Sequence, residues 1–492
     1  MSVKNMSIFR EPRLAFFVHI IYTDIIQFTK EGAEMSAKPV SPANDMTVGP
    51  EWKKILFFAL PIMAGQFLQQ LYNTVDGIVV GNFVSEAALG AVGACTTLSF
   101  LFLSISNGFG MGCGVMISQL FGAKRMDDVK RAVSTGLILL TAMGLAAMLL
   151  GRFGAQWLVT SVLNISESHL IELSVTYFSI VSLGMVFQFL YNCVASILRA
   201  VGDSKATLYF LCVSAVMNLI LDVVFVAFFD WGVAGAAIAT VISQIACVIV
   251  CFIYMFSKYP MFRFHRGEFR FSPDLGKLCL KLGAPMTLQQ AIVSCGNVIM
   301  QRLVNYFGEV TMAAFTCGMR IENYAMIPAM GFNSAMSMFT GQNIGANKPD
   351  RIERGWRSAI KMAICVTFVI ATVLFIGAYP LSALFGVDGE AQLQAVDYIR
   401  FVSYMMLIFS VYLTTNGVVQ GSGDALYASI CSFSTLGVRV ALAYALVFLF
   451  NFDYHVLWRC IPIGWMFAMI LALHYFLKDK WKNKSVIGGL AK

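Results

Sequence analysis

The chain has 492 residues, of which 58% are hydrophobic and only 13% are charged. Soluble domains have roughly a quarter of their residues charged, so this composition excludes a soluble globular protein and indicates a polytopic membrane protein. The formal net charge is +8. Because the basic residues fall in alternate short loops, this excess indicates membrane orientation and argues against nucleic-acid binding.

The first 50 residues differ from the rest and form a predicted N-terminal extension, 1–50. Its apolar stretch, 14–28, contains His19 and Asp24 and is too short to span a bilayer comfortably. No small-residue cleavage site follows it, so a secretory signal is not expected. Two interpretations stay open: an interfacial helix, and a mis-assigned start upstream of Met35.

Twelve apolar segments long enough to span a membrane follow the extension. They divide into an N-terminal six-helix bundle (51–257) and a C-terminal six-helix bundle (278–478), with a linker (258–277) between them and a tail (479–492) behind. The predicted fold is therefore all-α. In chain order the segments are 55–82, 89–119, 131–151, 170–198, 206–229, 232–257, 278–307, 311–341, 358–380, 395–420, 425–450 and 456–477.

The first segment carries a carboxylate, Asp76, in its second half. An acid at the bilayer centre costs about 2.5–3.5 kcal/mol on insertion scales, so it is retained where it faces a cavity, an ion or a partner. Gln69 lies two helical turns earlier, so both polar side chains share one face of the helix. We interpret this face as functional. The alternative is a carboxylate near the helix end that reaches water.

The second segment contains four glycines at alternate positions from Gly108 to Gly114. Small residues allow two helices to approach closely. Tight packing is the favoured interpretation of this run, and a hinge for a rocking motion is the alternative.

The 27 methionines and 41 phenylalanines are expected mostly to face lipid or the protein core. Some should line a central cavity, because flexible and aromatic side chains suit varied ligands. The substrate-cavity candidates lie on the fourth segment and are Phe187, Gln188, Tyr191 and Asn192.

Two charges interrupt the eighth segment, Arg320 and Glu322. Because they are two residues apart, they point to different faces of the helix. We favour structural ion pairs with other helices, with a share in the substrate path as the alternative. Arg302, Arg400 and Arg439 are interpreted as residues near helix ends whose charged groups reach water.

The charge of the loops alternates along the chain. The loops 81–89, 230–235, 307–311 and 386–397 carry no Lys or Arg. The positive-inside rule therefore places both termini and the central loop in the cytoplasm. The basic residues on that side are Lys124, Arg125, Lys130, Arg131, Arg199, Lys205, Arg263, Arg266, Arg270, Lys348, Arg351, Arg354, Arg357, Lys478, Lys480, Lys482 and Lys484.

The two halves of the chain repeat each other at an offset of 221–224 residues. Each repeat has six helices, so both have the same orientation, which predicts a pseudo-twofold axis along the membrane normal. A cavity between two such bundles suits alternating access. The matching elements are Pro61–Gln66 with Pro285–Gln290, Gln119–Lys124 with Gln342–Asn347, Arg131 with Arg354, Tyr177 with Tyr398, and Gly202-Asp203 with Gly423-Asp424.

Several of these stretches resemble one known family. LPIMAGQFLQQLYNTVDGIVVGNFVSEAALGAVG, QLFGAKRMDDVKR, its counterpart QNIGANKPDRIERGW, and LRAVGDSK are similar to motifs of the multidrug and toxic compound extrusion (MATE) transporters. The likeness covers about residues 52–480 and recurs in both halves. It implies an antiporter that exports organic, often cationic, compounds by means of a Na⁺ or H⁺ gradient.

The resemblance is strongest to the DinF-like branch of that family, and it implies a cation site. Asp76 and Gln69 match the first-helix acid and glutamine of the branch. Asn218 and Asp222 match its fifth-helix pair, and Thr240 matches a sixth-helix threonine. The residues themselves agree, because Asn218 and Asp222 share a helix face, and their oxygen ligands suit Na⁺ as well as a proton.

The seventh segment departs from a second branch of the family. The NorM-like transporters use acids in the second half, but 282–306 contains none, and Ile299 and Met300 stand opposite Asp76 in the repeat alignment. The predicted cation site therefore lies in the first half only.

The sequence thus predicts a secondary active efflux antiporter, multi-pass in the cell membrane and monomeric, with a small organic molecule as substrate and Na⁺ or H⁺ as coupling ion. No cofactor, nucleic-acid partner or further metal is expected, because the twelve cysteines lie in apolar segments without paired Cys-x-x-Cys motifs. The alternative function is a lipid-linked oligosaccharide flippase of the same superfamily. An enzyme is not expected, because the five histidines form no His-Glu-x-x-His motif.

Overall fold

The computed structural model describes residues 45–83, 86–163, 165 and 167–488, without the side chains of residues 72–83, 86–89, 227 and 483. The predicted interfacial helix or alternative start at 1–44 lies outside the described residues. The described chain is helical, which confirms the all-α prediction. Its α-helices are α2 (Glu51–Phe83), α3 (Glu86–Gly122), α4 (Met126–Trp157), α5 (Ser168–Leu183), α6 (Met185–Ala200), α7 (Ser204–Asp222), α8 (Gly232–Lys258), α9 (Pro273–Tyr306), α10 (Glu309–Gly345), α11 (Pro349–Leu384), α12 (Gly389–Ser422), α13 (Ala425–Phe450) and α14 (Val456–Leu477).

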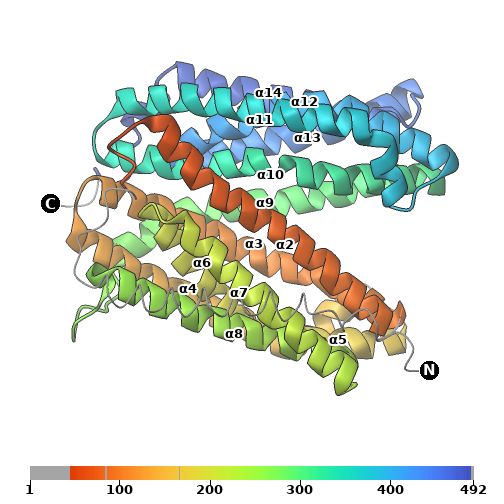
Figure 1. Cartoon of the computed structure of the whole chain (residues 1–492), viewed down its shortest axis with the longest axis horizontal. Helices are drawn as coiled ribbons and strands as arrows, with labels where there is room; N and C mark the ends of the chain where they lie inside the picture. The colour runs from red at the N-terminus through yellow and green to blue at the C-terminus, as the bar shows by residue number, and fades with distance from the viewer. Residues whose placement is uncertain (1–44, 84–85, 164, 166, 489–492) are drawn as a thin grey trace, which may run out of the picture.

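The helices form two bundles, an N lobe of α2–α8 and a C lobe of α9–α14 (Figure 1). Helix α2 begins beside α11 and α10 of the C lobe and continues along α7 of the N lobe. The predicted span 170–198 is not one straight helix, because α5 and α6 meet at an angle of 45°. The break falls at Gly184, where a Cβ atom would lie 2.1 Å from Oε1 of Gln244, so a larger residue there would require the Gln244 side chain to move.

Two further turns are π-helical, η2 (Leu158–Val162) after α4 and η3 (Val223–Phe228) after α7. With α5 and α6 counted as one bent span, the described helices make twelve spans, six in each lobe. Ten of these twelve are long and apolar enough to cross a membrane, while α9 and α10 are long but less apolar. Both pack against the opposite lobe through α3, so less of their surface faces lipid.

The repeat predicted from sequence extends to the hydrogen bonds of matching residues. Asp203 caps α7 by accepting from the backbone N–H of Ala206, and Asp424 caps α13 by accepting from that of Tyr427. The second oxygen of Asp203 accepts from Tyr254, Lys258 and Tyr259 at 2.7–2.9 Å. That of Asp424 accepts from Tyr475 and Lys484 at 3.0 Å. The same aspartate thus closes the same helix junction in both lobes.

Replacing Asp203 with alanine is expected to lower the stability of the folded protein by about 3 kcal/mol, because the helix cap is lost together with the hydrogen-bond acceptor of a partly buried lysine–tyrosine cluster. Asp203→Asn keeps the cap and should cost less. Thermal unfolding of the purified protein in detergent measures both, and Asp424→Ala, at the more exposed matching site, is the internal comparison. Equal melting temperatures for Asp203→Ala and wild type would contradict this role.

The lobes touch at one end of the molecule, where α2, α4, α7, α9, α11 and α13 begin; we call it the closed end. There α3 packs on α9 and α10 almost backbone to backbone. A Cβ atom on Gly112 would lie 2.6 Å from the backbone nitrogen of Gly283, and one on Gly108 would lie 2.2 Å from Oγ1 of Thr287. This confirms tight packing as the role of the glycine run 108–114, within an unbroken α3.

Candidate functional site

Three of the five predicted cation-site residues lie together in the N lobe. Asn218 and Asp222 are 1% and 2% exposed on one face of α7, in its last two turns. The side-chain nitrogen of Asn218 donates to Oγ1 of Thr240 on α8 at 3.4 Å, and Thr240 donates to the carbonyl of Ala236 at 3.0 Å. A carboxylate, an amide and a hydroxyl therefore meet where α7 gives way to the π-helical turn η3. Such hard oxygen ligands suit Na⁺ or a proton.

The other two predicted residues are on α2, which packs against both α7 and η3. Gln69 is half-buried on this helix. The backbone of Asp76 continues the same helix seven residues further, but its side chain lies outside the described residues. The structure thus brings the helices of the site together, while the Asp76 carboxylate stays a prediction.

The predicted substrate-cavity residues occupy one helix, α6, with different surroundings. Asn192 is buried, and its side chain donates to Oγ of Ser106 on α3 at 2.8 Å, so it joins two helices. Phe187, Gln188 and Tyr191 are half-buried. Their part in binding substrate stays a prediction.

In the C lobe the structure separates the two charges of the eighth span. Glu322 is buried and accepts a hydrogen bond from the hydroxyl of Tyr398 on α12. Arg439 is half-buried in the middle of α13, close enough to act on Glu322 electrostatically, which corrects its placement at a helix end. Arg320 is exposed and, among the described residues, has no acid within ion-pair distance. The expected ion pair is therefore wrong for Arg320 within that part of the chain.

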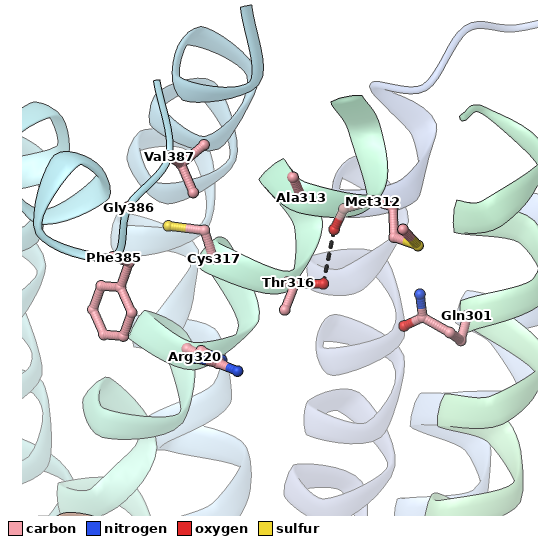
Figure 2. A pocket seen from close by; sticks show the side chains of 9 residues that line it. All are labelled: Gln301, Met312, Ala313, Thr316, Cys317, Arg320, Phe385, Gly386 and Val387. Carbon is pink, nitrogen blue, oxygen red and sulfur yellow. Dashed lines mark hydrogen bonds between the residues drawn. The ribbon is translucent and has the colours of Figure 1, made fainter. Parts of the chain in front are cut away.

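Arg320 lines a hollow at the far end of the C lobe, opposite the closed end (Figure 2). Its volume is about 510 Å³. The wall comes from α9, from the first turns of α10 and from the loop after α11. The lining residues are Gln301, Met312, Ala313, Thr316, Cys317, Arg320, Phe385, Gly386 and Val387.

Two matching glutamines bind across the closed end. Gln342 of α10 donates to the last carbonyl of α6, at Ala200, and accepts from the backbone N–H of Met46. Gln119 of α3 donates to the carbonyls of Gly421 and Ser422 at the end of α12, and accepts from the N–H of Val486. Both are fully buried. The recurrence of Gln-x-x-Gly-Ala in both halves was the sequence signal, but it did not reveal this contact.

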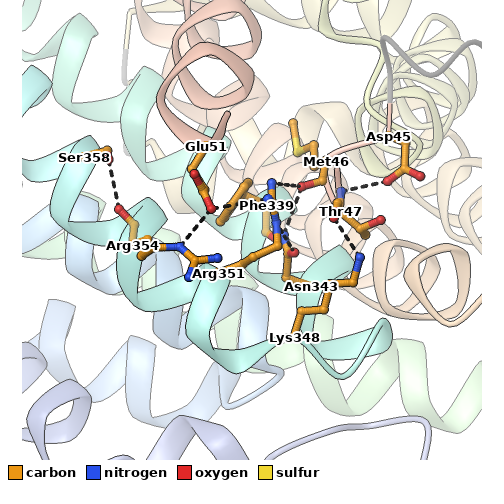
Figure 3. A network of polar contacts seen from close by, with 10 residues as sticks. All are labelled: Asp45, Met46, Thr47, Glu51, Phe339, Asn343, Lys348, Arg351, Arg354 and Ser358. Carbon is orange, nitrogen blue, oxygen red and sulfur yellow. Dashed lines mark hydrogen bonds and ion pairs between the residues drawn. The ribbon is translucent and has the colours of Figure 1, made fainter. Parts of the chain in front are cut away.

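The segment before α2 strengthens the closed end (Figure 3). The carbonyl of Met46 accepts from Asn343 and Arg351, and that of Thr47 accepts from Lys348. Glu51, in the first turn of α2, pairs with Arg351 at 3.3 Å and with Arg354 at 3.1 Å. Residues 45–51 therefore hold the N lobe against the start of α11.

The linker is bound to the N lobe, in the loop region after α8. Oγ of Ser134 donates to the carbonyl of Arg270 at 2.8 Å, and the N–H of Ser272 donates to Thr135 at 3.1 Å. A hydrogen bond from Lys130, aided by the N–H of His265, lowers the pKa of Glu268 to about 2. Glu268 therefore stays ionised at neutral pH and holds the linker to α4.

Comparison with known proteins agrees with this architecture. The MatE family model matches the chain twice, at residues 61–224 and 285–445, once in each lobe. "Probable multidrug resistance protein YoeA" of Bacillus subtilis is 27% identical over 445 residues, covering 88% of this chain and 95% of the relative. "Multidrug export protein MepA" of Staphylococcus aureus strain MSSA476 is 22% identical over 434 residues, covering 88% and 95%.

A solved structure described as the "Outward-facing conformation of a multidrug resistance MATE family transporter of the MOP superfamily" matches with a TM-score of 0.85. It is 23% identical, and the match covers 91% of this chain and 100% of that chain. Two repeated six-span bundles, each matched by the MatE family model, identify the chain as a membrane transport protein. The chain belongs to the MatE family. Family membership confirms the resemblance read from the sequence, the twelve-span fold and the expectation that the chain is a transporter, not an enzyme.

Proposed function

We propose that the chain is a multidrug efflux antiporter, which exports organic and often cationic compounds in exchange for Na⁺ or H⁺ by alternating access. The names of its relatives support export of drugs. Its acids in the first and fifth spans support the DinF-like branch. The cation binds at Asp76, Asp222, Asn218, Gln69 and Thr240, the substrate-cavity candidates are those on α6, and the protein acts as a monomer without a cofactor.

The observation that carries this proposal is the burial of Asn218 and Asp222 inside the membrane-spanning part of the N lobe. Acids within membrane-spanning helices usually lie on ion or proton pathways. A coupling cation suits the oxygen ligands of these two side chains. The membrane potential then contributes about 2.3 kcal/mol per charge per 100 mV to uphill export.

The orientation follows from the basic loops, which lie at the closed end. By the positive-inside rule the closed end, both termini and the linker face the cytoplasm of the cell. The described conformation then faces outward. Entry of the cation from outside favours this conformation and so promotes release of the substrate.

Transport by the purified protein in liposomes tests the proposal. An imposed Na⁺ gradient and an imposed pH gradient are tested separately. One of them is expected to drive ethidium uphill, and an ionophore that dissipates that gradient should stop the transport. Transport that is only downhill under both gradients would contradict antiport. Movement of a lipid-linked oligosaccharide, without transport of any organic cation, would identify the flippase alternative.

A further inference from the structure

The hollow that Arg320 lines is walled by C-lobe residues, and neighbours of Arg320 along α10 contact the N lobe. Tyr324, one turn along α10 from Arg320, packs its ring edge-on against Phe67 of α2, with the ring centres 6.0 Å apart. Met338, eighteen residues or five full turns from Arg320, lies within 3.6 Å of a Cβ built on Gly114 of α3. Residues at these spacings share one helix face. Arg320 therefore points toward the N lobe, just beyond the contact of Tyr324 with Phe67.

Arg320 lies on α10, a long helix of the C lobe that we count as one of its six spans. It is eleven residues from the start of α10 at Glu309, about 16 Å along the helix axis. At that depth an unpaired guanidinium is costly, so such residues usually face a watery cavity and bind a partner. The hollow of about 510 Å³ provides the cavity. Pockets of this size hold drug-sized molecules.

Nothing in the described part of the chain neutralises this charge. The nearby Glu322 points away, because two residues turn an α-helix by about 200°, and it is bound by Tyr398. The other polar side chains of the hollow are neutral, namely Gln301, Thr316 and Cys317. The amide nitrogen of Gln301 donates to Asn305 at 2.9 Å. A single cation in a hollow of otherwise neutral residues attracts an anionic group.

We propose that Arg320 is a specificity-determining residue that binds an acidic group of the exported compound. A planar guanidinium forms two parallel hydrogen bonds with a carboxylate or a phosphate ester, which an organic cation cannot accept. The substrates of this chain accordingly include zwitterionic or anionic organic molecules. This inference rests on the proposed function for the direction of transport, but the binding it describes does not depend on the coupling ion.

The two lobes then have separate tasks. The oxygen ligands on α7 and α8 of the N lobe bind the coupling cation, and the guanidinium on α10 of the C lobe binds the acidic end of the substrate. Because the two sites have opposite charge, cation and substrate do not compete for the same atoms.

A pair of dyes tests the proposal: a rhodamine with a free carboxylate, and the methyl ester of the same rhodamine, which is a cation. Arg320→Gln is expected to weaken binding of the free acid about tenfold, because a charge-assisted hydrogen bond is lost, and to leave the ester within about twofold. Fluorescence anisotropy with the purified full chain measures binding. Uptake into liposomes measures the KM of transport, which should rise by the same factor with kcat kept.

Arg400→Gln is the matched control. Arg400 is also exposed and lies eleven residues from the start of its helix, which corrects its predicted place near a helix end. It donates to the carbonyl of Phe375 and is not part of the hollow. Arg400→Gln should bind and transport both dyes as wild type does. Arg320→Lys keeps the positive charge without the planar guanidinium. Its affinity for the free acid should lie between those of wild type and Arg320→Gln.

Three outcomes would overturn the proposal. Arg320→Gln could weaken binding of both dyes equally, or weaken binding of neither, or Arg400→Gln could weaken binding of the free acid as much as Arg320→Gln does. An anionic lipid headgroup is the other source of the same chemistry. In that case Arg320→Gln would change transport of both dyes in liposomes containing phosphatidylglycerol and of neither in phosphatidylcholine alone. If wild type transports neither dye, ethidium transport still tests the proposed function, while the anisotropy measurement decides whether Arg320 binds the acid.

Discussion

Replacing both Gly122 and Gly345 with alanine is expected to prevent the lobes from meeting at the closed end. A Cβ atom on Gly122 would lie 1.9 Å from the carbonyl oxygen of Gln342, and one on Gly345 would lie 1.9 Å from that of Gln119. The colliding atoms are backbone, so no side chain can move aside. Overpacking costs about 1–3 kcal/mol per site, and 1.4 kcal/mol is a tenfold change in population. The pair should therefore shift the conformational equilibrium by about a hundredfold.

Two native thiols report this shift. Cys113 of α3 and Cys279 of α9 are fully buried beside the seam between the lobes, and the Cys279 thiol contacts the carbonyl of Phe109. In the double variant a water-soluble maleimide should label both thiols, and driven transport should fall by a similar factor. Peptide mapping separates these sites from the exposed Cys295 and Cys365.

Gly437→Ala is the control for this experiment, because a Cβ there would meet no atom within 4 Å. Its thiols should be labelled by the maleimide, and it should transport substrate, as in wild type. If the Gly122→Ala, Gly345→Ala double variant also behaved as wild type, the glycine contacts would not be needed for closure. Size-exclusion chromatography of each variant distinguishes a shifted equilibrium from misfolding.

Asp222→Asn is expected to reduce gradient-driven export at least about tenfold. The substitution keeps the size of the side chain, but an amide neither carries a proton at neutral pH nor offers Na⁺ a charged ligand. Binding of substrate should persist, because the loss concerns coupling. The measurements are driven uptake into liposomes under the active gradient and, in the same preparation, dye exchange without a gradient.

Asp230→Asn is the matched control, since Asp230 is an exposed carboxylate only eight residues further along the chain. It should leave driven export unchanged. Driven export by Asp222→Asn within about twofold of wild type would make Asp222 a structural residue. The cation site would then have to be sought at Asp76, which the same assay with Asp76→Asn examines.

The sequence was sufficient for the features that follow from local patterns. Apolar length and loop charge predicted the twelve spans, and the recurrence of Gly202-Asp203 as Gly423-Asp424 predicted a repeat whose hydrogen bonds also match. The bend at Gly184 was missed because residues 170–198 are predominantly apolar, and Gln244, which packs against Gly184, is sixty residues away. Local hydropathy carries no information about such a contact.

For the site residues, too, local sequence patterns were informative, whereas contacts between distant residues were not predictable. Asn218 pairs with Thr240 in the N lobe, and the cation binding that the family resemblance implied for them stays a prediction. The ion pair expected for Arg320 was wrong because sequence spacing gives the face of a helix but not the residues opposite it. The roles of Gln119 and Gln342 depend on partners more than 140 residues away, at the ends of α12 and α6.

Those two glutamines bind backbone carbonyls at helix ends, which have no hydrogen-bond partner within the helix. The last carbonyls of an α-helix have no partner within the helix and are otherwise bound by water. At the closed end the final carbonyls of α6 and α12 are instead bound by Gln342 and Gln119. Parting the lobes therefore requires water to enter and replace five hydrogen bonds in a dry seam. We expect hydration of these helix ends to be the slow event when the closed end opens, so that this step should slow in solutes that lower water activity.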